Sequence, residues 1–532
     1  MRPRWPVLVI VAVASFLCGG WLLQRGAAAD GGAYNEARLF DDVVSRVGQA
    51  YVDPVPDSVL YLKAADGLLE ELHDPYTVLL RGQDFTDLQE ETSGNYAGLG
   101  IRIDVRNGWI TVVAPLPDSP AERAGIETGD QLVSVDGRSA ESWQADAAVR
   151  RLRGSAGSKV TIGIRRGGDA GVQLYTLTRE EIHVRSVPPG TMFSNGTGYL
   201  SLNPVSDSSA SELATEITEL KAKGMRSLIL DLRNNPGGLL DQGIKVADLF
   251  LDRGQDIVST RGRIPSSSRT FSDQAPQQWP GLPVVVLVND GTASAAEIIA
   301  GALQDHDRAL IIGTPTFGKG LVQSLFPIDA HTALKITTAR WYTPSGRLIQ
   351  RKAKDQEDQA RIAADLAIGR PDSILADTAA PIAHTDAGRA VRGGGGIVPD
   401  LIVHEDSASA GEQALVKALG TRLGDFRDAV TATALRLRDA KAVTDEHFVV
   451  SPAMRSEVLG RLRKSGVPMN DGVWARGSTL VDRWIGGDVA RYVFGRSAEL
   501  RRRAAEDPQI QRALQVLRDA RAPKDLFAAS SH

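Results

Sequence analysis

The sequence has almost no cysteine: Cys18 is the only one in 532 residues, and it lies in an apolar run near the N-terminus. A single cysteine excludes intrachain disulfides, cysteine catalysis and thiolate metal sites. The eight histidines form no HExxH pattern and no evident pair, so we expect neither a metal nor any other cofactor. The formal net charge is only −4, and nothing in this balance favours binding to nucleic acid.

One long apolar stretch, Val7–Leu23, stands close to the N-terminus. Arg2 and Arg4 precede it, and Ala27–Ala29 offers the small residues of a cleavage site. A stretch of this length is near the lower limit for a membrane span. Residues 1–30 are therefore predicted to be a signal peptide or an N-terminal membrane anchor, which leaves association with the inner membrane open. Both alternatives place the rest of the chain outside the cytoplasm, in the periplasm or cell envelope.

The stretch from Val284 to Gln323 has the pattern of an active site. The apolar run Val284–Val288 predicts a buried strand that ends in a turn, and a helix of small residues is expected over Ala293–Asp305. Ser294 lies in the first turn of that helix, where a serine ordinarily serves only as a cap. The free amides of a helix start also stabilise a developing oxyanion, so we predict that Ser294 is a nucleophile.

A serine nucleophile needs a base, and Lys319 is a better candidate than His306. His306 is expected near the far end of the helix that Ser294 begins. Lys319 lies between Gly318 and Gly320, whose bare backbone lets the segment approach another closely. Desolvation lowers the pKa of a buried lysine by up to about 3–5 units, enough for the neutral amine to act as a base. The spacing alone is equally consistent with a solvated loop lysine.

Gln323 follows Lys319 by four residues, which places both side chains on one face if the segment is a strand. A glutamine amide can orient a neutral amine without adding the negative charge that would keep the amine protonated. We therefore add Gln323 to the predicted catalytic group.

The runs TASAAEIIAGALQD and TFGKGLVQ together resemble the C-terminal processing, or tail-specific, peptidases of the serine–lysine S41 family. The resemblance implies that Ser294 is the nucleophile, Lys319 the general base and Gln323 the amide that orients it. Asp305 also matches a family position and is expected on the same helix face as Ser294. Its implied role is supporting, or purely structural.

The loop Asn234–Gly238 follows a predicted buried strand and resembles a family loop whose glycine amide supplies half of the oxyanion hole. The sequence leaves open whether Gly237 or Gly238 does so. The amide of Ala295 would supply the other half. A plain strand-to-helix turn would show the same pattern. Strands that alternate with helices predict an α/β core, and the family resemblance implies that this core is crotonase-like.

A second resemblance covers the β-rich stretch Gly94–Ile182. Short alternating runs predict strands there, and the segment SPAERAGIETGDQLVSVDG between them resembles the centre of a PDZ domain. Such a domain adds a peptide as a strand on an open sheet edge. The resemblance implies that Leu99, Gly100 and Ile101 capture the peptide's terminal carboxylate with backbone amides. The alternative is that the glycines of this stretch only make turns.

The expected fold is multidomain α/β: a crotonase-like α/β protease core with an inserted β-rich PDZ domain and helical N- and C-terminal regions. The C-terminal extension carries 21 basic and 16 acidic side chains between Asp406 and His532. This excess of positive charge is compatible with binding of the extension to lipid, to the protease core or to a partner. The plainer alternative is that the extension is a helical cap on the protease. After the export segment, the expected ranges are 31–93 (helical), 94–182 (PDZ), 183–404 (protease core, with a polar insertion at 352–394) and 405–532 (helical extension).

The predicted function is that of an exported serine endopeptidase that recognises protein or peptide substrates by free, apolar C-termini. Two other classes stay open: a non-catalytic PDZ adaptor that binds protein C-termini, and a crotonase-like acyl-CoA enzyme. The presence of Ser294, Lys319 and Gln323 argues against the adaptor, and the PDZ and export segments argue against the acyl-CoA enzyme. An oligomer or an activator protein is a further expectation, and the sequence does not identify the substrate.

Overall fold

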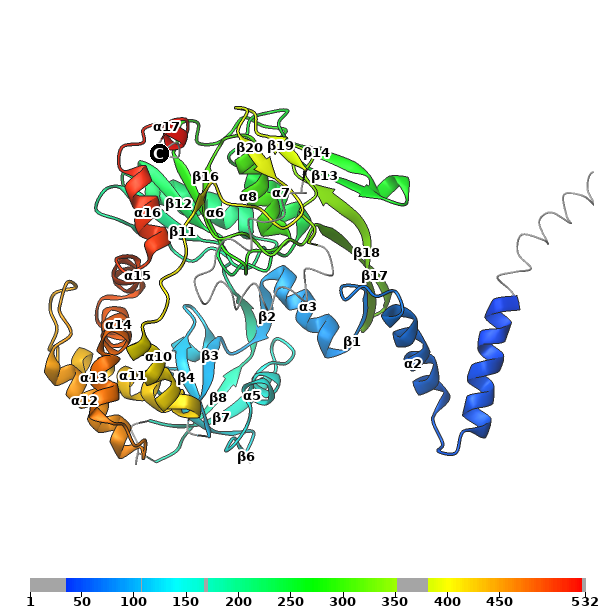
Figure 1. The fold of residues 1–532 in the computed structure, drawn as a ribbon. Coiled ribbons are helices and arrows are strands. Elements are labelled where there is room, and N and C mark those ends of the chain that lie inside the picture. The colour runs from blue at the N-terminus through cyan, green and yellow to red at the C-terminus, as the bar shows by residue number, and fades with distance from the viewer. Residues whose placement is uncertain (1–34, 107, 167–170, 352–380, 529–532) are drawn as a thin grey trace, which may run out of the picture. The chain divides into compact units, whose positions relative to one another are not determined.

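The computed structural model describes residues 35–106, 108–166, 171–351 and 381–528 (Figure 1). They form two compact units. The first contains the described residues up to Phe85 together with Gln323–Thr337, and the second contains Thr86–Val322 and the chain from Thr338 onward. The predicted export segment lies outside the described residues. Among those described, no helix is both long and apolar enough to cross a membrane.

The first unit is built from helices and short strands. A helix over residues 35–50 and α2 (Asp57–Glu70) follow the predicted helical spacing. β1 (Val78–Arg81) pairs antiparallel with the first part of β18 (Thr332–Tyr342). This strand corrects the expectation of helices throughout the N-terminal region. Its hydrogen bonds go to a segment far away in the sequence, which no local pattern reveals.

Several large apolar side chains of the first unit are exposed. Those of Leu39 and Val43 are 59% and 54% exposed, and Ile328 on β17 (Leu321–Asp329) is 62% exposed. Tyr51, Leu68 and Leu72 are exposed as well. The described part of this unit therefore leaves several large apolar side chains in contact with solvent.

The second unit begins with the region in which a PDZ domain was expected. After α3 (Gln83–Ser93), β2 (Asn95–Gly98) pairs antiparallel with β9 (Glu180–His183) and so brings the start and end of the region together. Between them lies a six-stranded sheet in which β3 forms one edge. The strands are β3 (Ile101–Arg106), β4 (Trp109–Pro115), β5 (Gln131–Val135), β6 (Arg138–Ser139), β7 (Lys159–Arg165) and β8 (Gln173–Thr178), with the helices α4 (Pro120–Arg123) and α5 (Ala145–Leu152).

The core of the second unit is a mainly parallel six-stranded sheet. Its order is β10-β11-β12-β15-β16-β21, and only β10 runs antiparallel to its neighbour. The strands are β10 (Thr191–Met192), β11 (Thr197–Ser201), β12 (Ser227–Asp231), β15 (Val284–Val288), β16 (Leu310–Gly313) and β21 (Leu401–Ile402), and the helices between them are α6 (Ser209–Ala222), α7 (Leu240–Asp248) and α8 (Ala295–Asp305).

Both faces of this sheet are buried, which explains why its strands are apolar without alternation. Val284, Val286 and Val288 pack against the side that carries α6, α7 and α8. Val285 and Leu287 point the other way and pack against α16 (Pro508–Leu517) near the C-terminus. The last helices of the extension thus cover the second face of this sheet.

An ion pair fixes α16 to the sheet. Arg233, just after β12, lies 2.8 Å from the carboxylate of Asp507, and Asp507 also caps the start of α16 by accepting hydrogen bonds from Gln509 and Ile510. Arg233 is held in turn by Asp231 at the end of β12. The covering helix is therefore anchored at the edge of the sheet where the strands end.

Another sheet contains β13 (Asp256–Gly262) and β14 (Arg269–Ser272), which pair antiparallel with each other. On its other side, β13 pairs antiparallel with the last part of β18. The polar insertion expected at 352–394 is described only from residue 381 onward. There it contains a hairpin of β19 (Ile382–His384) and β20 (Ala390–Arg392). The rest of that insertion lies outside the described residues.

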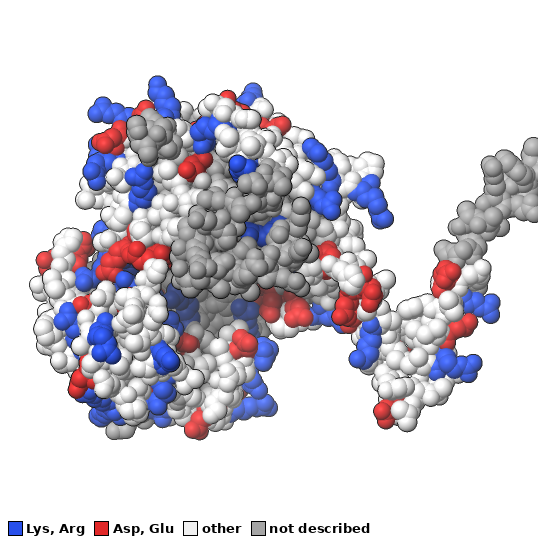
Figure 2. All heavy atoms as spheres, viewed as in Figure 1, with Lys and Arg blue, Asp and Glu red and all other residues white. Residues whose placement is uncertain are grey.

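The C-terminal extension is helical, as predicted, and has its own apolar core around Phe426, Trp474 and Val481. On the face shown in Figure 2, its Lys and Arg side chains alternate with Asp and Glu and form no field of one sign. Its elements are α10 (Ala410–Leu419), α11 (Leu423–Asp439), α12 (Pro452–Lys464), α13 (Asp471–Arg476), α14 (Ser478–Val489), the π-helical turn η4 (Ala490–Phe494), α15 (Arg496–Ala504), α16 and α17 (Asp525–Ala528).

Candidate active site

Ser294 occupies the sharp turn between β15 and α8. Its backbone has φ 54° and ψ −118°, a conformation that non-glycine residues rarely adopt. Such a residue costs about 1–3 kcal/mol and persists only where surrounding contacts impose it. Here a buried strand fixes the entry to the turn and a fully buried helix fixes the exit. The side chain is half-buried at the start of the helix.

The carboxylate of Glu297 joins the nucleophile turn to the lysine loop. Its Oε2 atom accepts hydrogen bonds from the amides of Ser294, at 2.8 Å, and Lys319, at 2.9 Å. Its Oε1 atom accepts from the amide of Gly318, at 2.8 Å, and from the hydroxyl of Thr316, at 2.5 Å. All four neighbours donate, and an ionised carboxylate is the form that can accept from every one of them.

Glu297 is completely buried. Burial raises the pKa of its carboxyl group, and the hydrogen bonds from Thr316, Lys319, Gly318 and Ser294 act in the opposite direction. Because one oxygen atom holds the backbones of Ser294 and Lys319 together, the structure brings these two predicted residues into one site. Further contacts hold the Lys319 loop: the Trp341 indole donates to the Lys319 carbonyl at 2.9 Å, and the Phe317 amide donates to the Thr292 carbonyl at 3.0 Å.

The predicted oxyanion loop lies against the nucleophile turn. A Cβ atom on Gly237 would lie 2.8 Å from the Cβ of Ser294 and 2.9 Å from the amide nitrogen of Ala295, so only glycine fits there. The Gly237 amide donates to the side chain of Asn235 at 2.9 Å. Within the described part of the chain, the amides of Gly238 and Ala295 have no hydrogen-bond acceptor. These two amides are therefore the ones free to bind an oxyanion beside Ser294.

Asp305 lies at the other end of α8, roughly 16 Å from Ser294 by helix geometry. Its carboxylate is 1% exposed and pairs with the guanidinium of Arg347, which is equally buried. It also accepts hydrogen bonds from the amide and the hydroxyl of Ser345, at 2.9 and 2.7 Å. Asp305 thus anchors the segment after β18 to the end of the helix.

Gln323 lies on β17, four residues after Lys319. Its amide nitrogen Nε2 is buried and has no hydrogen-bond partner among the described residues. Gln323 belongs to the first compact unit and Lys319 to the second. The orienting role that the resemblance implies for Gln323 stays a prediction.

The predicted carboxylate loop of the PDZ region leads from β2 into β3. The carbonyls of Leu99 and Gly100 accept hydrogen bonds from the amides of Ala121 and Leu116, at 3.1 and 2.8 Å. The amides of Leu99 and Gly100 find no acceptor among the residues that the structure describes. Gly100 has φ +69°, and a Cβ atom there would lie 2.3 Å from that of Ser119. The loop thus keeps its donors unpaired at the start of edge strand β3, whose first residue is Ile101.

Sequence reasoning missed Glu297 and Thr316, which organise the site. A signal was available for Glu297, because a glutamate three residues after a serine at a helix start is the pattern of a capping box. That pattern would have explained the bond to the Ser294 amide, but not the bonds to the lysine loop. Thr316 carries no such signal.

Comparisons with known proteins agree with the two resemblances. The model of peptidase family S41 matches residues 196–364, and the model of the PDZ domain matches residues 111–166. The carboxy-terminal-processing protease of Bartonella bacilliformis is 39% identical over 321 residues, which cover 60% of this chain and 73% of the relative. The carboxy-terminal processing protease CtpA of Bacillus subtilis is 33% identical over 360 residues, or 67% and 76% of the two chains.

Among solved structures, the photosystem II D1 C-terminal processing protease is 30% identical to this chain. The match covers 58% of this chain and 88% of that protein, with a TM-score of 0.35. The S41 match contains both Ser294 and Lys319, and the PDZ match lies within the range predicted for that domain.

Proposed function

The chain belongs to peptidase family S41, among the carboxy-terminal processing proteases, and on that premise we propose that it is an exported serine endopeptidase with a Ser294–Lys319 dyad. Its protease core and PDZ domain confirm the expected fold class. The observation that carries the proposal is the shared bond of the Ser294 and Lys319 backbones to Glu297. This shared anchor supports the proposal that the serine and the lysine act together in one reaction.

In the proposed reaction the Ser294 hydroxyl attacks the scissile carbonyl while the neutral amine of Lys319 takes its proton. The ammonium then gives this proton to the leaving amine, and an acyl-enzyme remains on Ser294. Water next attacks the ester with Lys319 again as the base, which releases the acid and restores the hydroxyl. In both tetrahedral intermediates the amides of Gly238 and Ala295 would bind the oxyanion. Gln323 would orient the amine.

We further propose that the PDZ domain delivers substrates by their C-terminal tails. The unpaired amides of Leu99 and Gly100 suit a free carboxylate, and the adjoining β3 offers an edge on which a peptide can add as a strand. Leu99, Ile101 and Ile103 belong to the apolar core of the domain, which suits an apolar last side chain.

Amidation of a substrate's C-terminus is expected to slow cleavage at least tenfold. It removes the charge that the loop amides bind, and a hydrogen bond to a charged group contributes about 1.5–3 kcal/mol, or roughly 10- to 150-fold in binding. An aspartate as the last residue should have a similar effect, because its charge would enter an apolar pocket. The measurement is kcat/KM for matched free-acid and amidated substrates.

The control is an unrelated endopeptidase that cuts the free-acid and the amidated substrate at equal rates. It shows that amidation leaves the cleavage site itself unchanged. Equal kcat/KM values for the two substrates with this enzyme would refute recognition of tails, whatever the role of Ser294.

Export and partners are also part of the proposal. Residues 1–30 would carry the chain to the periplasm or cell envelope and would stay attached only if they form an anchor. The N-terminal residue of the mature protein, read by mass spectrometry, distinguishes a cleaved signal from an anchor.

The exposed apolar side chains of the first unit favour a further copy of the chain or an activator protein as a partner.

A further inference from the structure

The outer face of the PDZ edge strand carries charged residues. Within the described part of the chain, β3 pairs only with β4, so its other edge is open. Ile101, Ile103 and Val105 pack toward the core of the domain. Successive side chains of a strand point to opposite faces, so Arg102 lies on the outer face, together with Asp104 and Arg106.

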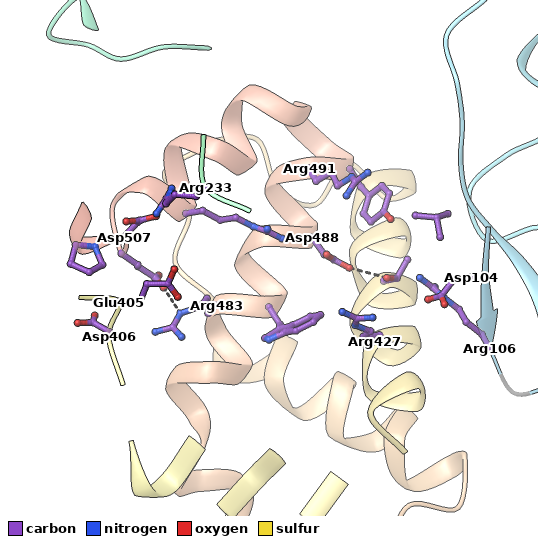
Figure 3. Close-up of a pocket in the computed structure, with 17 residues that line it drawn as sticks. Asp104, Arg106, Arg233, Glu405, Asp406, Arg427, Arg483, Asp488, Arg491 and Asp507 are labelled. Atoms are coloured by element: carbon purple, nitrogen blue, oxygen red, sulfur yellow. Dashed lines mark hydrogen bonds and ion pairs between the residues drawn. The ribbon is translucent and has the colours of Figure 1, made fainter. Parts of the chain in front are cut away.

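The C-terminal helices stand over this outer face. Asp428 on α11 forms an ion pair with Arg106 at 3.1 Å, and a Cβ atom at Gly129 would lie 3.7 Å from Cδ1 of Leu435 on the same helix. Between the helices and the strand is a pocket of about 660 Å³, in which Asp104 and Arg106 face Arg427 and Arg491 (Figure 3). The extension therefore shapes one wall of the space beside β3.

Positive charge is incompletely matched there. Arg102 and Arg496 have no carboxylate within ion-pair distance among the described residues. Burial lowers the pKa of the Arg102 guanidinium, and the positive charges of Arg491 and Arg496 lower it further. Glu499 raises the pKa of Arg102 and so partly offsets these positive charges, but its carboxylate is shared between Arg503, at 2.8 Å, and Arg491, at 3.9 Å. An added negative charge next to Arg102 would therefore be stabilised.

The register of a bound tail follows from the strand. If the loop amides hold the terminal carboxylate, the last residue lies opposite Ile101 with its side chain toward the core. In an antiparallel pair, opposed residues share a face, so the penultimate residue lies opposite Arg102 on the outer face. The residue before it again faces the core, opposite Ile103.

We propose that Arg102, with Arg491 of the C-terminal extension, binds the penultimate side chain of the substrate tail and selects an acidic residue there. The inference rests on the proposed tail recognition and adds a charge preference at one position. It also gives the C-terminal extension a part in substrate choice.

Peptide binding to the full-length Ser294→Ala protein tests this proposal without cleavage. The probes are fluorescent decapeptides that end in leucine and carry either glutamate or lysine at the penultimate position. We expect the glutamate peptide to bind about tenfold more tightly, because an attraction to Arg102 and Arg491 replaces a repulsion from them. In a second pair of peptides, which carry the charges one position earlier, this preference should be absent.

Charge variants locate the preference. Adding Arg102→Glu should reverse it, and Arg491→Ala should reduce it. Arg138→Glu makes the same change of charge on exposed β6 and should leave it intact. A glutamate preference that persists in Arg102→Glu, or its absence from the parent protein, would overturn the proposal. If amidated and free peptides bind equally, tail recognition itself fails, and the two failures are thereby distinguished.

Discussion

Replacing Lys319 with arginine is expected to inactivate the enzyme as completely as replacing it with alanine. Arginine keeps the positive charge and most of the length of lysine, but it stays protonated at any workable pH and cannot accept a proton. A general base contributes about 10²–10⁴-fold to the rate, so kcat/KM should fall at least about a hundredfold in both variants. A lysine that only bound substrate electrostatically would tolerate arginine much better.

The measurement is kcat/KM on one unfolded protein substrate for wild type, Lys319→Arg and Lys319→Ala. Lys245→Arg, on the exposed side of α7, is the matched control and should keep full activity. If Lys319→Arg retained more than about a tenth of the wild-type rate, Lys319 would not be the base.

Replacing Glu297 with glutamine should remove activity almost as thoroughly, although Glu297 takes no part in the proposed proton transfers. The carboxylate accepts from four donors, and a glutamine would present an NH₂ group to some of them. Each lost bond to a charged acceptor costs about 1.5–3 kcal/mol. The turn of Ser294 and the loop of Lys319 would lose their common anchor, and we expect kcat/KM to fall at least about a hundredfold.

The chain provides a matched control for this substitution. Glu412 occupies the same position in the first turn of α10, where it accepts from the amide of Ser409 at 2.8 Å. Glu412→Gln should lower the melting temperature and leave the specific activity of the folded enzyme unchanged. Wild-type activity in Glu297→Gln would show that the shared carboxylate does not position the site.

The sequence was most informative where a pattern is local. The strand Val284–Val288, the helix that ends at Asp305 and the alternating strands of the PDZ domain were predicted from periodicity and found close to the expected bounds. The combination of Ser294 with a lysine between two glycines was equally visible. All of these features depend on neighbours within a few residues.

Features that depend on distant contacts could not be predicted in the same way. The strand β1 forms because β18 offers a partner, and Val285 is buried because α16 covers its face of the sheet. The sequence gives no sign that Asn235 engages the Gly237 amide, which is why it could not distinguish Gly237 from Gly238. Glu297 likewise acts through a loop that follows it by some twenty residues.

The central claim, that this chain cuts proteins with Ser294 as its nucleophile, is tested most directly by cleavage with purified wild-type and Ser294→Ala protein. The substrate is an unfolded protein with a free, apolar C-terminus, and binding of its tail is measured in parallel. We predict that wild type cleaves it, and that Ser294→Ala binds the tail as tightly and yields no products. Equal cleavage by both proteins would contradict the serine mechanism, and tight binding without cleavage by wild type would instead identify a PDZ adaptor.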